Sequence, residues 1–436
     1  MYGTRDIIVV LFIVGSLPFC FFRPFYGVLL WTVLSFLNPQ ELSWGAAREF
    51  PVALLVAVPT LLGGLLFGKQ WGALKSRETL LLLVLWAWFT LTTIHTSFTP
   101  VFADHAADAW FRWRFVSKIL VMAILTIVAV DTWAKLRWLM LAISLSFGFF
   151  VLKAIPWMIV TGGHYRLYGP PGTMVGDNND FGLALNMTLP MFFCLTKTEA
   201  NRKLRMLMVV LFLTTILAIF FTYSRGALVG LALVLTGMMM RLRHRFLLLP
   251  VILLAGFFAA FLTPDAWQRR MDFRQDGALI DSSALSRFNS WTYSWRLALD
   301  NPVMGGGFEA YTPRLFNLYA PNPKDVHGPH SIYFGVLAEH GFLGLMMYLS
   351  LVGACLMALQ KLIRQARFWG HEHGASYAMM LQLSILGFLG SGAFLGRAYF
   401  DYYFTIVAST IILKHLCQRE WAEQAIAEPV LEEQEV

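Results

Sequence analysis

The sequence predicts an all-α polytopic membrane protein with about twelve transmembrane helices, on the basis of three observations. Hydrophobic residues fill 57% of the 436 positions and charged residues only 14%, with a mean hydropathy of +0.60, unlike a soluble domain. The apolar runs are about 16 to 28 residues long, enough for helices to cross a hydrocarbon core of ~30 Å. Basic short loops alternate with loops of little charge, as in a chain that crosses a membrane repeatedly.

Apolar periodicity places the helices along the whole chain. The expected segments are 7–22, 25–38, 52–68, 78–96, 115–131, 135–153, 181–197, 204–223, 226–241, 246–262, 331–359, 375–394 and 398–417. The first segment lacks a small-residue cleavage site and should stay in the mature chain. Residues 7–38, interrupted at Arg23 and Pro24, cross the membrane once or twice, which gives about twelve spans, or about thirteen with the N-terminus outside.

The basic loops fix the expected orientation. They lie near residues 69–77, 135–137, 197–205, 241–245 and 361–367, and the positive-inside rule assigns them to the cytoplasm. We therefore expect an N-terminal transmembrane bundle over 1–262, a large outer loop over 263–329, C-terminal transmembrane helices over 330–418 and a cytoplasmic acidic tail over 419–436.

Several function classes are disfavoured. Four cysteines without Cys-x-x-Cys spacing argue against a metal site or a disulfide framework and predict free, packed thiols. No phosphate-cradling glycine loop, Gly-x-Ser-x-Gly elbow or spaced metal-ligand cluster is found, so an ATP-driven pump is disfavoured and no cofactor or metal is expected. The net charge of +8 reflects membrane orientation better than nucleic-acid binding.

The large outer loop contains a predicted amphipathic helix on the membrane surface, over residues 283–299. Its apolar stripe consists of Leu285, Phe288, Trp291, Trp295 and Leu299. The helix is expected to stop at 301–302, and residues 305–308 are expected to form a tight turn. Residues 104–114, which are rich in tryptophan, predict a second interfacial segment.

Arginines near the outer side are candidates for binding an anion. Arg225 lies where one helix ends and the next begins, and a helix N-terminus favours a phosphate there. Arg287 and Arg296 lie on roughly opposite faces of the loop helix, and Arg287 is expected to point inward. Each of them is also compatible with a simple contact to lipid headgroups.

His330 precedes a long apolar helix, which would hold its imidazole at the outer mouth of the bundle as a general base. Taken alone, a histidine at a helix start is more often a capping or packing residue, and His327 is a rival for the base. Glu339 is an intramembrane carboxylate on the same helix, with either a direct role or a structural pairing with Arg397 or another buried base.

Two polar segments open helices on the outer side. Arg397 and Asp401 precede the last helix together with three tyrosines. Residues 177–180, Asp-Asn-Asn-Asp, offer oxygen ligands for Ca²⁺ or Mg²⁺ but lack a full ligand-loop spacing. Helix N-capping by Asn179 or Asp180 is the preferred interpretation.

A site with arginines and one histidine at the outer leaflet suits a substrate with a diphosphate headgroup on a lipid tail. These residues resemble the bacterial O-antigen ligase and polymerase superfamily, within it the O-antigen ligase family, with features of an O-glycosylation ligase branch. The resemblance covers most of the chain, but its specific motifs lie in the second half. They are Tyr-Ser-Arg225-Gly, then Arg287 with Asn-Pro-Val-Met-Gly-Gly-Gly-Phe over 301–308, and His-Ser-Ile-Tyr-Phe-x-x-Leu-x-Glu-x-Gly-x-x-Gly over 330–344.

The resemblance implies a metal-independent, inverting glycosyltransferase of GT-C architecture in the bacterial inner membrane, with a periplasmic active site. It would move a glycan from undecaprenyl diphosphate to a hydroxyl of lipid A-core. Carried over by motif, Arg225 and Arg287 would bind the diphosphate, His330 would deprotonate or orient the acceptor hydroxyl, and Glu339 would support the site.

Other functions remain open at the level of sequence. A polymerase of glycan repeat units and a protein O-glycosylation ligase share the same motifs and differ in the acceptor. A polyprenyl-glycan transporter would place charges along a path through the membrane midplane, whereas here they cluster on one side. A non-catalytic assembly protein would have no need of His330.

Overall fold

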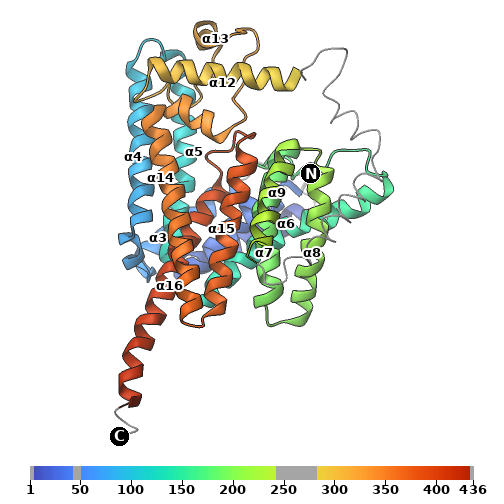
Figure 1. Cartoon of the computed structure of the whole chain (residues 1–436), viewed down its shortest axis with the longest axis vertical. Coiled ribbons are helices and arrows are strands. Elements are labelled where there is room, and N and C mark those ends of the chain that lie inside the picture. Colours follow the sequence, from blue (N-terminus) through green and yellow to red (C-terminus); the bar gives the residue numbers. More distant parts are fainter. Residues whose placement is uncertain (1–3, 43–50, 242–281, 433–436) are drawn as a thin grey trace.

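The computed structural model describes residues 4–42, 51–241 and 282–432, and this part of the chain is helical without a strand (Figure 1). The helices that cover the expected N-terminal segments are α1 (Thr4–Phe22), α2 (Pro24–Phe36), α3 (Val52–Phe67), α4 (Arg77–Phe98), α5 (Ala106–Ala129), α6 (Trp133–Val160), α7 (Asn178–Thr198), α8 (Arg202–Phe221) and α9 (Arg225–Met239). The later ones are α12 (Ser282–Asp300), α13 (Pro313–Tyr319), α14 (Ile332–Phe368), α15 (Glu372–Gly392) and α16 (Asp401–Glu432). The all-α prediction is confirmed.

Four of these helices, α4, α6, α8 and α14, are long and apolar enough to span a membrane. α2, α3, α9 and residues 7–22 of α1 are shorter apolar helices. The expected count of about twelve spans therefore stays a prediction. The expected segment 246–262 and the start of the outer loop lie outside the described residues.

The core of the bundle is formed by α7 and α15, which pack against each other and against α9. Both helices are buried along most of their length. Asn186 of α7 donates to the carbonyl of Ala227 (2.7 Å) and to the hydroxyl of Ser391 (2.9 Å), which ties α7, α9 and α15 together. The free thiols predicted for the four cysteines are confirmed, and all four are buried.

The N-terminal stretch is a folded-back helical pair. α1 and α2 are separated only by Arg23, and the short 3-10 helix that follows α2, Pro39–Leu42, contacts α1. Such a contact requires α2 to run back along α1, and both pack on α3. The two ends of the pair therefore lie near each other. The number of membrane crossings within residues 7–38 and the side on which the N-terminus lies stay predictions.

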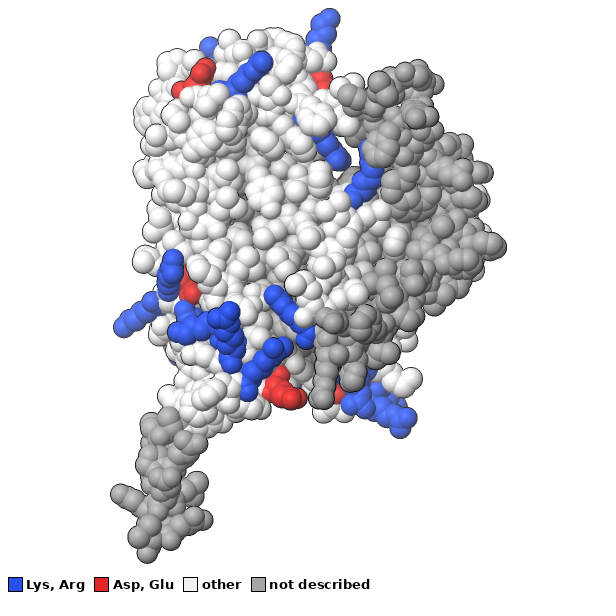
Figure 2. All heavy atoms as spheres, viewed as in Figure 1, with Lys and Arg blue, Asp and Glu red and all other residues white. Residues whose placement is uncertain are grey.

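The basic loops that lie within the described residues, near 69–77, 135–137, 197–205 and 361–367, gather at one end of the molecule, the end from which α16 projects (Figure 2). Ion pairs connect them there: Lys135 with Asp131, Arg137 with Glu199, Lys414 with Glu78, and His371 with Glu420. α16 is longer than the expected 398–417 because it continues as a helix into the tail. The orientation of this end toward the cytoplasm stays a prediction.

The predicted loop helix is confirmed as α12, which lies across the opposite end of the bundle (Figure 1). Its Tyr293 and Leu297 are buried against α13 and the loops beside it. Leu285, Phe288, Trp295 and Leu299 of the expected apolar stripe are instead exposed, at 47–56% of their side-chain surface. These four residues are therefore available to the membrane surface, as predicted for the helix, whereas Trp291 of the same stripe stacks on Phe334 of α14, with the ring centres 5.2 Å apart.

Most of the tryptophan-rich segment 104–114 forms the start of α5, which begins at Ala106, and its place at the membrane interface stays a prediction. Trp110 donates to the hydroxyl of Ser97 (2.9 Å) and Trp113 to that of Thr90 (3.0 Å). Both indoles are thus held by α4 through polar groups that periodicity alone does not reveal.

Candidate functional site

Arg225 is placed by the start of α9, as the sequence predicts. Ser224 caps the helix by accepting a hydrogen bond from the amide of Ala227 (3.2 Å). The preceding Tyr223 has a left-handed backbone (φ 53°), and its hydroxyl donates to the carbonyl of Gly163 (2.5 Å). This turn orients Arg225 toward α12.

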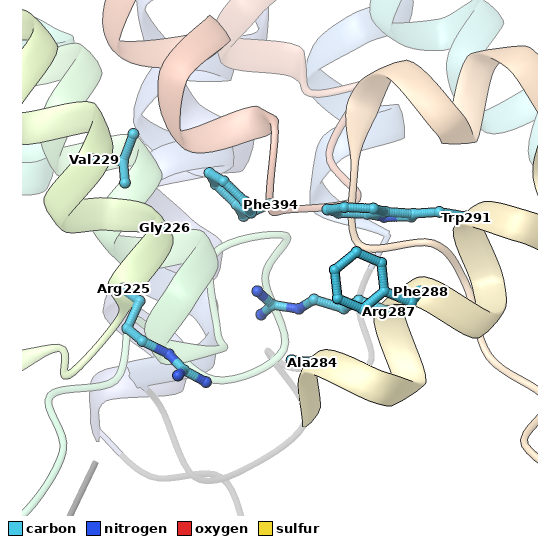
Figure 3. Close-up of a pocket in the computed structure, with 8 residues that line it drawn as sticks. All are labelled: Arg225, Gly226, Val229, Ala284, Arg287, Phe288, Trp291 and Phe394. Atoms are coloured by element: carbon cyan, nitrogen blue, oxygen red, sulfur yellow. The ribbon is translucent and has the colours of Figure 1, made fainter. Parts of the chain in front are cut away.

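Arg225 and Arg287 line one groove, of about 200 Å³, between α9 and α12. Figure 3 shows their guanidinium groups turned toward the space between the two helices. The remaining lining residues are Gly226, Val229, Ala284, Phe288, Trp291 and Phe394, all apolar. We name this set of eight residues the donor groove. It combines two cations with an otherwise apolar wall.

The helix that carries Glu339 is broken, which corrects the expected continuous helix 331–359. Gly341 has φ 68° and ψ −174° inside α14. The glycine turn predicted at 305–308 lies against the break. The amides of Gly306 and Gly307 donate to the carbonyls of Ala338 and Glu339, both at 2.8 Å. The break and the turn thus satisfy each other's backbone groups.

Both partners of this contact require glycine. Gly305 has φ 64°, and a Cβ there would lie 2.6 Å from the amide nitrogen of Gly341. A Cβ on Gly341 would lie 2.6 Å from the carbonyl oxygen of Pro302. Two motifs that stand apart in the sequence therefore form one structural unit, the glycine clamp, made of residues 302–307 and 338–342.

Glu339 is held by the clamp in a buried polar setting. Its carboxylate accepts hydrogen bonds from the hydroxyl of Tyr399 (2.5 Å) and from the amide of Glu309 (3.1 Å). Arg397 is not its partner, because Arg397 pairs with Asp180 of α7 at 2.5 Å. The alternative in which Glu339 pairs with Arg397 is therefore wrong.

Glu339 lines a second cavity, of about 420 Å³, which we name the polar cavity. Its charged and titratable lining residues are Arg112, Asp180, Glu309, Tyr311, His327, His330, Glu339, Arg397 and Tyr399. Phe394 of the donor groove and Gly396 of the polar cavity belong to the same loop. The two hollows are therefore neighbours.

His330 stands between the two hollows. It lines the polar cavity, while Trp291 of the donor groove donates to the carbonyl of the preceding Pro329 (2.7 Å). Its side chain is exposed to the hollow, yet the surrounding protein atoms lower the pKa of His330 below its ordinary value. The nearby guanidinium of Arg287 adds to this effect. A lowered pKa favours the neutral imidazole, the form that accepts a proton.

His327 is occupied by structural contacts. Its imidazole hydrogen bonds to the hydroxyls of Ser286 and Ser290 of α12 and lies 3.4 Å from the carboxylate of Asp325. These contacts attach the loop before α14 to α12, so the geometry favours His330 over His327 as the group presented to a substrate.

Two candidates lie away from both hollows. Arg296 is exposed and its Nη1 donates to the carbonyl of Tyr319 (3.3 Å). Asp401 accepts from the amide of Tyr402 (2.8 Å) at the start of α16. At the start of α7 the capping residue is Asp177, which accepts from the amide of Asn179 (2.8 Å). The expected cap at Asn179 or Asp180 is wrong, since Asp180 faces Arg397 instead.

Arg112 and Glu309 were missed by the sequence analysis. The guanidinium of Arg112 lies 3.6 Å from the carboxylate of Glu309 and 5.9 Å from the ring centre of Tyr399. Arg112 sits inside the tryptophan-rich segment, where an arginine suggests only an interface. An acidic residue directly after the glycine turn was the one available signal for Glu309.

Within the described ranges, no group of three or more His, Cys, Asp or Glu side chains is arranged to hold a metal ion. Comparison with known families gives two matches. Residues 210–349 match the family described as O-Antigen ligase, and residues 4–192 match a family of unknown function (DUF5935). The search of curated proteins returned no match. The O-antigen ligase match contains the donor groove arginines, the glycine clamp, His330 and Glu339.

Proposed function

Because the chain belongs to the O-antigen ligase/polymerase superfamily, we propose that it is an O-antigen ligase. In this proposal it is an inverting, metal-independent glycosyltransferase of GT-C type that uses no cofactor. It transfers a glycan from undecaprenyl diphosphate to a hydroxyl of lipid A-core. The site lies at the periplasmic face of the inner membrane, on the side opposite the basic loops.

One observation carries the proposal, the adjacency of the donor groove and the polar cavity with His330 between them. A polyprenyl chain is apolar and its diphosphate is anionic, which matches an apolar groove with two arginines. An acceptor sugar is rich in hydroxyls, which matches a cavity lined by carboxylates, tyrosines and arginines.

The reaction follows from this arrangement. Arg225 and Arg287 hold the diphosphate and stabilise the negative charge that grows on it as the bond between the anomeric carbon and the phosphate oxygen breaks. The acceptor oxygen attacks the anomeric carbon from the opposite face, and its proton passes to the neutral imidazole of His330. The products are the glycosylated acceptor and undecaprenyl diphosphate. Glu339 and Arg112 position the acceptor from the polar cavity.

The test is transfer by the purified full chain in lipid nanodiscs, supplied with undecaprenyl-diphosphate-linked glycan and lipid A-core. Wild type should give a glycosylated lipid A-core with altered gel mobility. His330→Ala should lower the rate by about 1,000-fold, since a positioned general base contributes on the order of 10²–10⁴. Arg296→Ala, on the exposed side of α12, serves as the matched control and should keep full activity.

Each alternative has its own outcome. Full transfer by His330→Ala would remove His330 as the base. Lengthening of the glycan on undecaprenyl diphosphate without transfer to lipid A-core would identify a polymerase. Transfer to a protein side chain alone would identify a protein O-glycosylation ligase. Movement of the lipid-linked glycan across the bilayer without any transfer would identify a transporter.

A further inference from the structure

A third hollow, unrelated to the donor groove and the polar cavity, lies at the end of the bundle marked by the basic loops. It has a volume of about 510 Å³. Its cations are Arg23 between α1 and α2, Lys69 just after α3, and Lys135 in the first turn of α6. We name these three residues and the hollow that they line the basic pocket.

The charge of the basic pocket is only partly balanced. Lys135 forms an ion pair with Asp131, and its ammonium lies 5.6 Å from the ring centre of Phe25. Arg23 and Lys69 are exposed and form no ion pair within the described part of the chain. Three cations from three separate segments therefore line one hollow, and only one of them is paired with a carboxylate. This arrangement favours an anion between them.

The rim of the basic pocket is apolar and open. Phe22, Tyr26, Leu66 and Phe67 line it, with 45–67% of their surface exposed. α2 also begins here, so its positive N-terminal end faces the same hollow. A free phosphate would use the cations but not this rim, whereas a molecule with an anionic head and apolar chains would use both.

We propose that the basic pocket binds the phosphodiester headgroup of an anionic phospholipid from the leaflet on the basic side, with its acyl chains along the exposed aromatic and leucine rim. The bound lipid joins the α1–α2 pair to the end of α3 and the start of α6. It acts as a structural ligand at the end of the molecule away from the proposed active site, and it is independent of the proposed function.

The test compares lipids on the detergent-purified full chain. Phosphatidylglycerol should raise the thermal midpoint by about 2 °C or more and remain bound in native mass spectrometry. Phosphatidylethanolamine, which has no net charge, should do neither. The double variant Arg23→Gln with Lys69→Gln should bind phosphatidylglycerol roughly 30-fold more weakly, since each of the two cations near a lipid surface contributes about 1 kcal/mol and a factor of ten corresponds to about 1.4 kcal/mol.

The matched control removes two charges elsewhere on the same end, as Arg202→Gln with Lys203→Gln at the exposed start of α8. It should bind phosphatidylglycerol like wild type. An equal loss in the control would mean that general surface charge attracts the lipid, which overturns the proposal. An equal thermal shift with inorganic phosphate alone would overturn the assignment to a lipid.

A charge-preserving variant guards against a folding defect. Arg23→Lys with Lys69→Arg keeps both charges and should retain the bound lipid. If the glutamine variant loses lipid while this variant keeps it, the loss comes from charge. If both variants keep the lipid, the cations do not form the site, and if both lose it equally while remaining folded, charge is not the cause of the loss.

Discussion

The donor groove and the polar cavity share a loop but have opposite chemistry. The groove presents two cations in an apolar wall, whereas the polar cavity interleaves carboxylates with arginines, as in the pairs Arg112 with Glu309 and Arg397 with Asp180. Charges of one sign in the groove suit a substrate that supplies the opposite charge. Charges paired in the cavity suit a neutral substrate read by hydrogen bonds. Under the proposed function, the protein distinguishes donor from acceptor by charge before shape.

The largest loss of transfer is expected when the arginines of the donor groove are removed. We expect Arg225→Ala and Arg287→Ala each to reduce transfer by about 100-fold, because each removes charge stabilisation on the leaving diphosphate. Initial rates at saturating acceptor measure the effect, with Arg296→Ala as the control. An unchanged rate in the double variant would mean that the groove does not hold the diphosphate.

The glycine clamp can be broken without touching a substrate group. Gly341→Ala places a Cβ 2.6 Å from the carbonyl oxygen of Pro302 on a left-handed backbone, which should cost about 1–3 kcal/mol and displace Glu339. Transfer should fall by about 100-fold, and the thermal midpoint should drop.

The matched control for the clamp is Gly353→Ala in the same helix, where an added Cβ meets no atom within 4 Å. It should leave both readouts unchanged. Equal behaviour of the two alanine variants would show that the helix break is not needed for the site.

The polar cavity is probed by Glu339→Gln, which keeps the size of the side chain but replaces one of the two oxygens that accept from Tyr399 and from the Glu309 amide with an NH2 donor. We expect the KM for the acceptor to rise by about tenfold, with the KM for the donor unchanged. A donor KM that rises equally would contradict the division of labour between the two hollows.

The smallest effect is on the pH profile. The pKa of His330 is lowered, first by desolvation and then by Arg287 and His327, with Arg397 acting in the same direction and Asp177 opposing. Since the proposed general base is the neutral imidazole, transfer should decline as the pH falls, with the midpoint of the decline below 6.5, the ordinary pKa of a histidine.

Arg287→Gln should move this decline to higher pH, because removing a nearby positive charge raises the pKa of His330. The midpoint should still stay below the ordinary pKa of a histidine, since desolvation is the larger cause of the lowered pKa and remains. Arg296→Gln should leave the profile in place. If transfer declined at the same pH in Arg287→Gln as in wild type, the charge of Arg287 would not act on His330.

The sequence predicted the elements of the site well and their pairing poorly. Helix periodicity located α12, and the motif around Arg225 located the start of α9, because both are local patterns. The pairing of Arg397 with Asp180 and of Glu339 with Tyr399 spans 217 and 60 positions, respectively. Such contacts depend on tertiary packing, which one sequence does not encode in any local spacing.

The exposed stripe of α12 shows a related limit. Periodicity identified Phe288 and Trp295 as one face but could not say whether that face meets protein or lipid, because both environments are apolar. The helix break at Gly341 was missed for a different reason. A glycine within an apolar run is common in membrane helices. Only the turn at Gly305–Gly307, which packs against Gly341, explains why a glycine is required at this position.

The glycine clamp also bears on how the protein is made. The amides of residues 306 and 307 and the carbonyls that receive them are separated by about thirty residues of chain, and those carbonyls belong to a later helix. During synthesis the turn at 305–307 emerges first. Its amides have no carbonyl partners until α14 has entered the bilayer. Transfer activity should therefore require complete membrane insertion. A truncated chain that ends before Gly341 should contain the arginines, His330 and Glu339 but show no transfer activity.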